Sequence, residues 1–241
     1  MFYFLLSPIM TYNFLLIAAA VIPAILLMLK VYRMDRLERE SNQILWQLVK
    51  AGILSSLMAM VSERVLSMLL RNFVSPADTL YHVILYFGIV AFSEEGAKYL
   101  MLRRSTWNSH EFNCQYDGVV YAVFVSLGFA LWENVSYVLS YGMKTALVRA
   151  ITAIPGHACF GVFMGVFYAI SKKYDNKRLP SKSKSFRILS VVIPALLHGA
   201  YDYIATLEQP GTGWFFVIFI AVLFSVSYIT VDRAARYDRF I

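Results

Sequence analysis

The sequence predicts an all-α integral membrane protein, a polytopic helix bundle of about seven transmembrane helices that forms a single domain over residues 1–241. Hydrophobic residues make up 59% of the chain and charged residues only 15%, and the mean hydropathy is +0.59. A soluble domain of this length could not bury so much apolar surface in its core. The apolar residues also gather into segments of roughly 20, the length that crosses a hydrocarbon core ~30 Å thick.

Seven apolar segments have this length, and we expect each to form one helix. Their limits are residues 10–29, 44–70, 80–102, 118–140, 150–170, 188–207 and 214–231. We treat the first as a retained span, since no basic stretch precedes it and no small-residue cleavage site follows. Lys50, Glu63 and Arg64 interrupt the second, whose outer part is therefore a candidate interfacial helix.

The positions of Lys and Arg predict how the helices are oriented in the membrane. If the amino terminus is outside, the inner loops hold four, two, seven and three of the 22 basic residues. These loops lie within residues 30–39, 103–104, 172–187 and 233–239. The outer side holds Arg71, Lys144 and Arg149. This bias predicts an external amino terminus and a cytoplasmic carboxyl terminus. We expect the basic loop 171–187 to lie against anionic lipid, and no nucleic acid partner.

Ionisable side chains inside the predicted helices are few, and four of the helices share them. They are Glu94, Glu95 and Lys98 in the third helix, Glu133 in the fourth, His157 in the fifth, and His198 and Asp202 in the sixth. Each charged group near the bilayer centre costs ~2.5–3.5 kcal/mol, so such groups persist where they face each other or a wet cavity. We therefore predict that the four helices converge on one polar site.

Helical spacing indicates which of these groups meet. Glu94 and Glu95 lie four and three residues before Lys98, so either carboxylate can pair with the amine. We expect the paired carboxylate to be ionised and the other to keep its proton, a separation that acid–base chemistry requires. His198 and Asp202 are also four residues apart, so Asp202 can orient the imidazole or share a metal with it. A self-neutralising structural patch remains the alternative for the third segment.

Proline and glycine positions indicate local distortion and close packing near the histidines. Pro155 lies two residues before His157, and Pro194 lies four before His198. A proline inside a membrane helix frees a carbonyl and bends the helix, so we expect kinks beside both histidines. The GxxxG spacing at 161–165 predicts close approach of a neighbouring helix.

Two hydrolytic chemistries fit these residues. In a metal-free scheme, one glutamate deprotonates a water that attacks a peptide carbonyl, while a histidine donates to the oxyanion. In a zinc scheme, His157, His198 and Glu95 bind the metal and a second carboxylate acts as base. The chain lacks H-E-x-x-H, and its nearest approach is the H-x-x-x-D of 198–202. Serine catalysis is disfavoured, because Ser93 has no Gly-x-Ser-x-Gly setting.

Four motifs contain these polar residues: "SEEGAKYL" at 93–100, "YDGVVYAVFVSLGFALWENVSYV" at 116–138, "RAITAIPGHACFGVFMG" at 149–165 and "LLHGAYDY" at 196–203. The four motifs resemble those of the PrsW family of bacterial intramembrane proteases. They occur in the family's order and lie within a motif-bearing core, 79–207. The motifs are also similar to those of type II CAAX prenyl endopeptidases and bacteriocin-immunity proteins.

The resemblance implies a multi-pass protease of the bacterial plasma membrane. Its expected substrate is a single-pass anti-sigma factor, whose site-1 cleavage starts regulated intramembrane proteolysis and releases a sigma factor for stress-response genes. The resemblance implies catalytic roles for Glu94, Glu95, His157 and His198, and supporting roles for Lys98, Glu133 and Asp202. One glutamate is expected to be the base, and which one stays open. The preferred scheme needs no cofactor, and zinc is its alternative.

Three other functions compete with proteolysis of an anti-sigma factor. An ion-coupled transporter also uses buried carboxylates and kinked helices, but internal repeats would be expected, and none is evident between the two halves. A prenyl protease would need prenylated substrates. A non-catalytic binding or immunity protein would capture a partner helix through the same polar residues.

Overall fold

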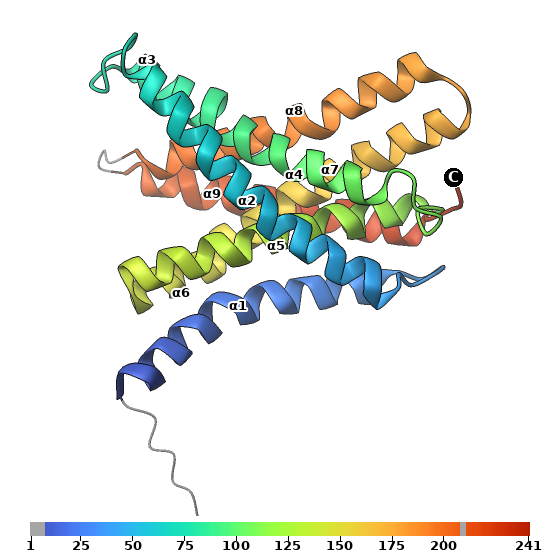
Figure 1. The fold of residues 1–241 in the computed structure, drawn as a ribbon, viewed down its shortest axis with the longest axis horizontal. Helices are drawn as coiled ribbons and strands as arrows, with labels where there is room; N and C mark the ends of the chain where they lie inside the picture. The colour runs from blue at the N-terminus through green and yellow to red at the C-terminus, as the bar shows by residue number, and fades with distance from the viewer. Residues whose placement is uncertain (1–7, 208–210) are drawn as a thin grey trace, which may run out of the picture.

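The computed structural model describes residues 8–207 and 211–241, and it shows a bundle of long helices (Figure 1). The helices are α1 Pro8–Met34, α2 Asn42–Leu70, α3 Thr79–Val83, the π-helix η1 Ile84–Val90, α4 Ala91–Thr106, α5 Gln115–Tyr141, α6 Met143–Ile151, α7 Ala153–Asn176, α8 Pro180–Ala205 and α9 Gly213–Arg236. No β-strand forms within these two ranges, whose only extended pairing is an isolated bridge between Cys114 and Phe240. The all-α prediction is confirmed.

The helices match the predicted membrane spans. Six stretches of the described chain are long and apolar enough to cross a membrane, and α6 with α7 counts as one of them. The predicted third span is not among the six, since its helical run is divided between α3, η1 and the charged helix α4. That run is nevertheless continuous from residue 79 to residue 106. With it, residues 8–207 and 211–241 contain seven long helical runs, the number expected from the sequence.

Alternate connections lie at the same end of the bundle. The segments 35–41, 107–114 and 177–179 and the carboxyl terminus are all at the right of Figure 1. These connections lie in or next to the Lys- and Arg-rich segments that the sequence predicts to be cytoplasmic. Their position at one end of the bundle agrees with the prediction that they share one side of the membrane. The orientation itself stays a prediction. One expectation was wrong: most of 171–187 is helix rather than loop, because α7 runs to Asn176 and α8 begins at Pro180.

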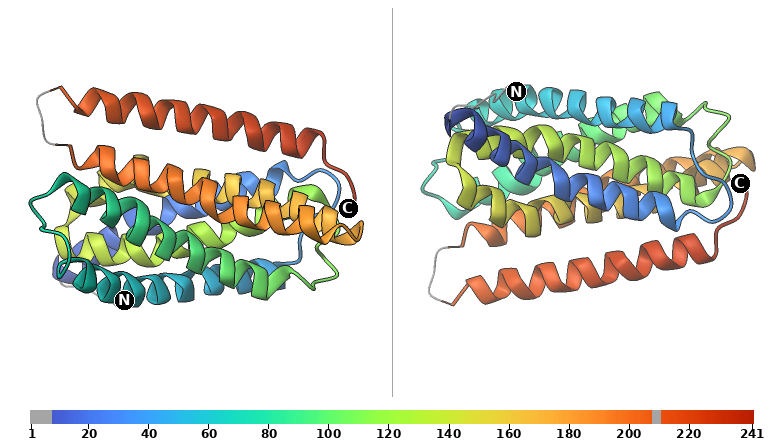
Figure 2. Two further views of the ribbon diagram at one scale, coloured as in Figure 1. Left: turned by 90° about the horizontal axis from the view of Figure 1, so that it is seen from above. Right: turned by 90° about the horizontal axis from the view of Figure 1, so that it is seen from below.

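Helix α5 forms the centre of the bundle, packed against α1, α2 and α7. All its residues from Tyr116 to Ala130 are buried. Small residues allow this packing, since a methyl group at Gly118 would lie 2.8 Å from the Cβ of Ala169 on α7. One at Gly165 would collide with the Gly118 backbone. The predicted close approach at 161–165 is thus confirmed, and it brings α7 directly against α5. Helix α9 lies along the outside (Figure 2).

The region around Pro155 differs from the expected kink. The predicted span 150–170 is divided, because α6 ends at Ile151 and α7 begins at Ala153. Pro155 therefore lies in the first turn of α7, where its missing N–H removes no helical hydrogen bond. His157 follows in the next residues of an unbroken helix. Pro194 does lie inside α8, one turn before His198.

Candidate active site

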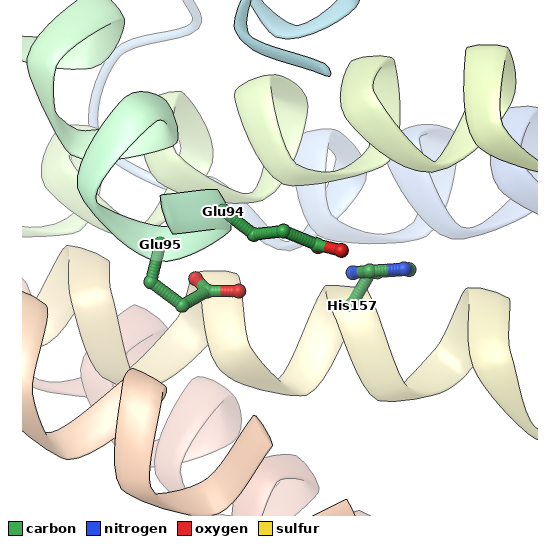
Figure 3. A group of neighbouring side chains, drawn as sticks. All are labelled: Glu94, Glu95 and His157. Atoms are coloured by element: carbon green, nitrogen blue, oxygen red, sulfur yellow. The ribbon is translucent and has the colours of Figure 1, made fainter. Parts of the chain in front are cut away.

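The glutamate pair and Lys98 lie on the part of α4 that faces the interior of the bundle. All three side chains are buried, with Glu95 and Lys98 completely enclosed and Glu94 6% exposed. Figure 3 shows both glutamate side chains leaving α4, with the His157 ring on α7 directed toward the Glu94 carboxylate. The predicted polar site therefore exists.

Lys98 contacts both glutamates and one histidine. Its Nζ lies 3.1 Å from Glu94 Oε2, 2.7 Å from Glu95 Oε1 and 3.2 Å from His157 Nδ1. An ammonium group has three hydrogens, so all three are used. The Phe129 ring also lies below the amine, with its centroid 3.9 Å away. We expected Lys98 to pair with one carboxylate; it pairs with both, because the i,i+3 and i,i+4 positions flank it on one helical face.

His157 joins Lys98 to a second ion pair. Its Nδ1 accepts from the Lys98 ammonium, which has no acceptor of its own, so its Nε2 carries the hydrogen and donates to Glu133 Oε2 at 2.8 Å. Arg149 Nη2 lies 2.9 Å from the same Glu133 oxygen. The ring is thereby fixed in both tautomer and orientation.

His198 is held by the other glutamate. Its Nδ1 donates to Glu95 Oε1 at 2.9 Å, and its Nε2 lies 3.4 Å from Asp202 Oδ2. The predicted contact between His198 and Asp202 is confirmed, but it is the longer of the two. The ring also stacks on Phe160, with centroids 4.8 Å apart. Glu95 therefore bridges Lys98 and His198, while the second nitrogen of His198 is only loosely engaged.

A π-helix positions the start of α4. In η1 the backbone is wound so that the N–H of Ala91 bonds to the carbonyl of Tyr86, five residues back. Such segments are rare and are frequent near functional sites. Helix α8 packs closely on it at Gly199, where a methyl group would lie 2.6 Å from the Phe87 ring and 2.9 Å from its Cα. Gly199 follows His198 directly, so the same contact brings the histidine to the glutamates.

A cavity of about 470 Å³ opens beside these residues. Its polar lining includes Glu63, Glu94, Glu133, His157, His198 and Asp202. Glu95 and Lys98 do not line it, because they lie behind Glu94. The two adjacent glutamates thus have different surroundings: Glu94 reaches the cavity, and Glu95 is enclosed by the protein.

Two cavity residues were not predicted as members of the site. Arg149 was assigned to the outer loop side, but α6 directs its guanidinium to Glu133 and to the side chain of Asn134. Glu63 was noted only as an interruption of the second apolar segment, yet α2 places it in the cavity wall. An isolated carboxylate within a membrane-length apolar run was the available signal for Glu63. Arg149 had no such signal, since it lies just outside the predicted span 150–170 and just before the break between α6 and α7, which the apolar pattern conceals.

The fold and the site together define a class of protein. A multi-pass helix bundle encloses two carboxylates, two imidazoles and an amine beside a cavity, which is the donor and acceptor set of an intramembrane hydrolase. The chain belongs to the PrsW family: the model of that family, described as "PrsW family intramembrane metalloprotease", matches residues 40–229. The chain is therefore an intramembrane peptidase, and the resemblance of its four motifs is confirmed.

Curated relatives agree with this assignment, and two of them match nearly the whole chain. Protease PrsW of Halalkalibacterium halodurans is 32% identical over 226 residues, covering 94% of this chain and 100% of the relative. Protease PrsW of Geobacillus kaustophilus is 31% identical over 227 residues, covering 94% and 95%. Protease PrsW of Bacillus subtilis is 41% identical over 115 residues, 48% of this chain and 51% of the relative. No solved structure matches.

The family description implies a metal, and the donor set can be compared with what zinc requires. Ligand atoms of Glu94, Glu95 and His157 all lie within 4.8 Å of one another. Two carboxylates and an imidazole suit zinc, and three protein ligands would leave a position for water. Glu95 Oε2 is also buried without a hydrogen-bond partner. The set fits zinc in type and spacing.

The Lys98 ammonium, however, lies among the same three donors. A zinc ion and this amine could not share the position, so metal binding requires Lys98 to withdraw. The fitting set also differs by one member from the predicted set of His157, His198 and Glu95, since Glu94 takes the place of His198.

Proposed function

We propose that the chain makes the site-1 cut in a single-pass anti-sigma factor of the bacterial plasma membrane, with Glu94 as the base that activates water. The observation that supports this choice is the difference between the two glutamates, because Glu94 lines the cavity and Glu95 does not. A base must reach the water whose proton it removes, so access decides between two otherwise similar groups.

The proposed step uses the contacts of the site directly. Glu94 takes a proton from water as the water oxygen attacks the scissile carbonyl carbon. His198, in its imidazolium form, donates from Nε2 to the developing oxyanion, since its Nδ1 hydrogen is held by Glu95 and its contact with Asp202 is long. Glu94 then returns the proton to the leaving nitrogen as the C–N bond breaks. The products are a carboxyl and an amino terminus, and the Glu94 carboxylate is restored.

Lys98 and His157 act by position in this scheme. The ammonium holds the two carboxylates in place and offsets their negative charge, and Glu133 and Arg149 hold the ring that accepts from it. Zinc, when bound by Glu94, Glu95 and His157, would supply an activated water and a Lewis acid for the carbonyl. Cytoplasmic basic residues are proposed to contact anionic lipid in either scheme.

Substitution of each glutamate tests the assignment. With an epitope-tagged single-pass anti-sigma factor as co-expressed substrate, Glu94→Gln should slow cleavage at least ~100-fold, because the general base is lost. Glu95→Gln should also stop cleavage, but it should lower thermal stability as well, since it weakens the pairing of the enclosed Lys98. Asp175→Asn, an exposed carboxylate on α7, is the matched control and should cleave as wild type.

The outcomes separate the competing functions. Cleavage by Glu94→Gln at the wild-type rate would show that Glu94 is not the base. If the wild-type protein binds the transmembrane helix of an anti-sigma factor but does not cleave it, the protein is a non-catalytic binding protein. Metal analysis of purified protein decides between the two chemistries, because stoichiometric zinc that leaves together with activity on chelation contradicts the metal-free scheme.

A further inference from the structure

A second buried acidic group lies at the end of the bundle that is predicted to face the cytoplasm. Three segments distant in sequence meet there: the connection 35–41, the start of α5 and the carboxyl-terminal tail. The tail is tied to α5 by hydrogen bonds from Gln115 N to Arg239 O at 3.0 Å and from Tyr116 N to Asp238 Oδ1 at 2.8 Å. Tyr121 on α5 donates to Glu40 Oε2 at 2.7 Å.

Three carboxylates converge where these segments meet. Ligand atoms of Asp35, Glu40 and Asp117 lie within 4.8 Å of one another, and the three residues are 4%, 6% and 1% exposed. In the part of the chain that the structure describes, no Lys, Arg or His forms an ion pair with any of them. Arg39 attracts Asp35 only from a distance. Buried carboxylates without a counter-charge are strongly unfavourable, so something must neutralise this group.

Asp35 is the residue that points to a ligand. Both of its carboxylate oxygens are buried and neither has a hydrogen-bond partner, although the Leu37 and Glu38 amides lie nearby. Its neighbours are partly satisfied: Glu40 uses Oε2 for Tyr121, and Asp117 uses Oδ2 for the amides of Asn113 and Cys114. The carboxyls of Glu40 and Asp117 also lie within hydrogen-bonding reach of each other, which requires a proton or a cation between them. Asp238 Oδ2, close by, is also buried without a partner.

We propose that Asp35, Glu40 and Asp117 bind one divalent cation of the hard, oxygen-preferring kind, Ca²⁺ or Mg²⁺, which fastens the connection 35–41 to α5. The donors are all carboxylate oxygens, which these ions prefer and zinc or copper do not. The site is separate from the glutamates of α4 and does not depend on the proposed proteolytic chemistry. It would serve stability and not the reaction.

Protons are the alternative means of neutralisation. Burial raises the pKa of Glu40 to about 9, and it raises that of Asp35 as well. The groups that face these two carboxyls are Asp117, Tyr121, Glu111, Asp238 and Arg39. A folded-state pKa above the unfolded value means that stability would fall as pH rises between about 4.3 and about 9 if protons alone were bound. A bound cation would remove this fall.

Ion binding to the purified full-length protein in detergent tests the proposal. After treatment with EDTA, wild type should bind one ⁴⁵Ca²⁺ per chain, or one Mg²⁺ by competition, with a Kd of about 1 mM or tighter. Either ion should raise its Tm. Asp35→Asn should weaken binding at least about tenfold and lose the shift in Tm, because it removes the carboxylate with two free oxygens. It should remain folded, since it also removes a buried charge.

Asp175→Asn is again the matched control and should bind as wild type does. Absence of saturable binding near neutral pH, together with a Tm that rises as pH falls and ignores both ions, would overturn the proposal in favour of protons. Equal binding by wild type and Asp35→Asn would show that the ion sits elsewhere, which would overturn it too. Neither result bears on cleavage by Glu94, so the two proposals fail independently.

Discussion

The lysine of α4 is a fixed internal counter-ion. Lys98 has three hydrogens and three acceptors, drawn from Glu94, Glu95 and His157, and no exposed surface. A buried charge with complete hydrogen bonding holds its neighbours in one geometry, whereas removal of a partner leaves an uncompensated charge. The glutamates to which we assign the proposed chemistry are therefore held in place by a residue that does not itself line the cavity.

Glu133 is expected to matter through His157. Glu133→Gln removes the negative charge that receives the Nε2 hydrogen and pairs with Arg149, so the ring can turn away from Lys98. We expect kcat to fall about 10- to 100-fold with little change in KM, measured by cleavage at varied substrate concentration in detergent. Ser136→Ala is the control, because Ser136 lines the same cavity but bonds only to its own helix. Equal kcat values for the two variants would show that Glu133 does not contribute to the reaction.

Helical periodicity predicts the local pairs of the site but not its long-range ones. Glu94 with Lys98, Glu95 with Lys98, and His198 with Asp202 follow from spacing on one helix, and all three pairs are present. The contact between Glu95 and His198 joins residues 103 positions apart, and spacing carries no information about it. Convergence could be expected only because isolated buried charges are costly.

At the scale of elements, η1 and α8 set the position of α4. The π-helix could not be read from "ILYFGIV", since its apolar residues suit an ordinary helix equally well. The break between α6 and α7 was concealed for the same reason, and only Pro155 marked it. Element type was predictable from length and hydropathy, while local winding depends on packing such as that of Gly199 on Phe87.

Gly199→Ala should disturb the site indirectly, through the contact of α8 with η1. The added methyl group would press on the Phe87 ring and backbone, so η1 must shift, and overpacking of this kind costs about 1–3 kcal/mol. Because the glutamates follow η1 directly, we expect cleavage to slow about 10- to 100-fold. Kinetic assay and thermal unfolding of the purified variant measure both effects.

Gly96→Ala is the matched control for this substitution. It lies between Glu95 and Lys98 on α4, and nothing lies within 4 Å of the added methyl group. Replacing glycine by alanine inside a helix stabilises it by roughly 0.5–1 kcal/mol. Activity should be retained and Tm should rise slightly. If Gly96→Ala impairs cleavage as much as Gly199→Ala, the defect does not come from the contact with η1.

At the scale of the whole molecule, the fold and the distribution of Lys and Arg are consistent with the same predicted orientation in the membrane. The connections rich in Lys and Arg share one end of the bundle, and the opposite end has few such residues. A green fluorescent protein fused after Ile241 should therefore fluoresce in the cytoplasm, and alkaline phosphatase at the same position should be inactive. Fusions within 71–78 should give the reverse pattern. Active phosphatase at the carboxyl terminus would invert the predicted topology.

The ion pairs of α4 also bear on how the protein enters the membrane during synthesis. His157 and His198 belong to helices that are translated after α4, so they cannot offset its charges when it first meets the bilayer. Lys98 can, because it lies within one turn of both glutamates on the same helix. Helix α4 therefore carries into the lipid a counter-charge for one of its two carboxylates, and the later arrival of α7 and α8 supplies the remaining polar partners of the site.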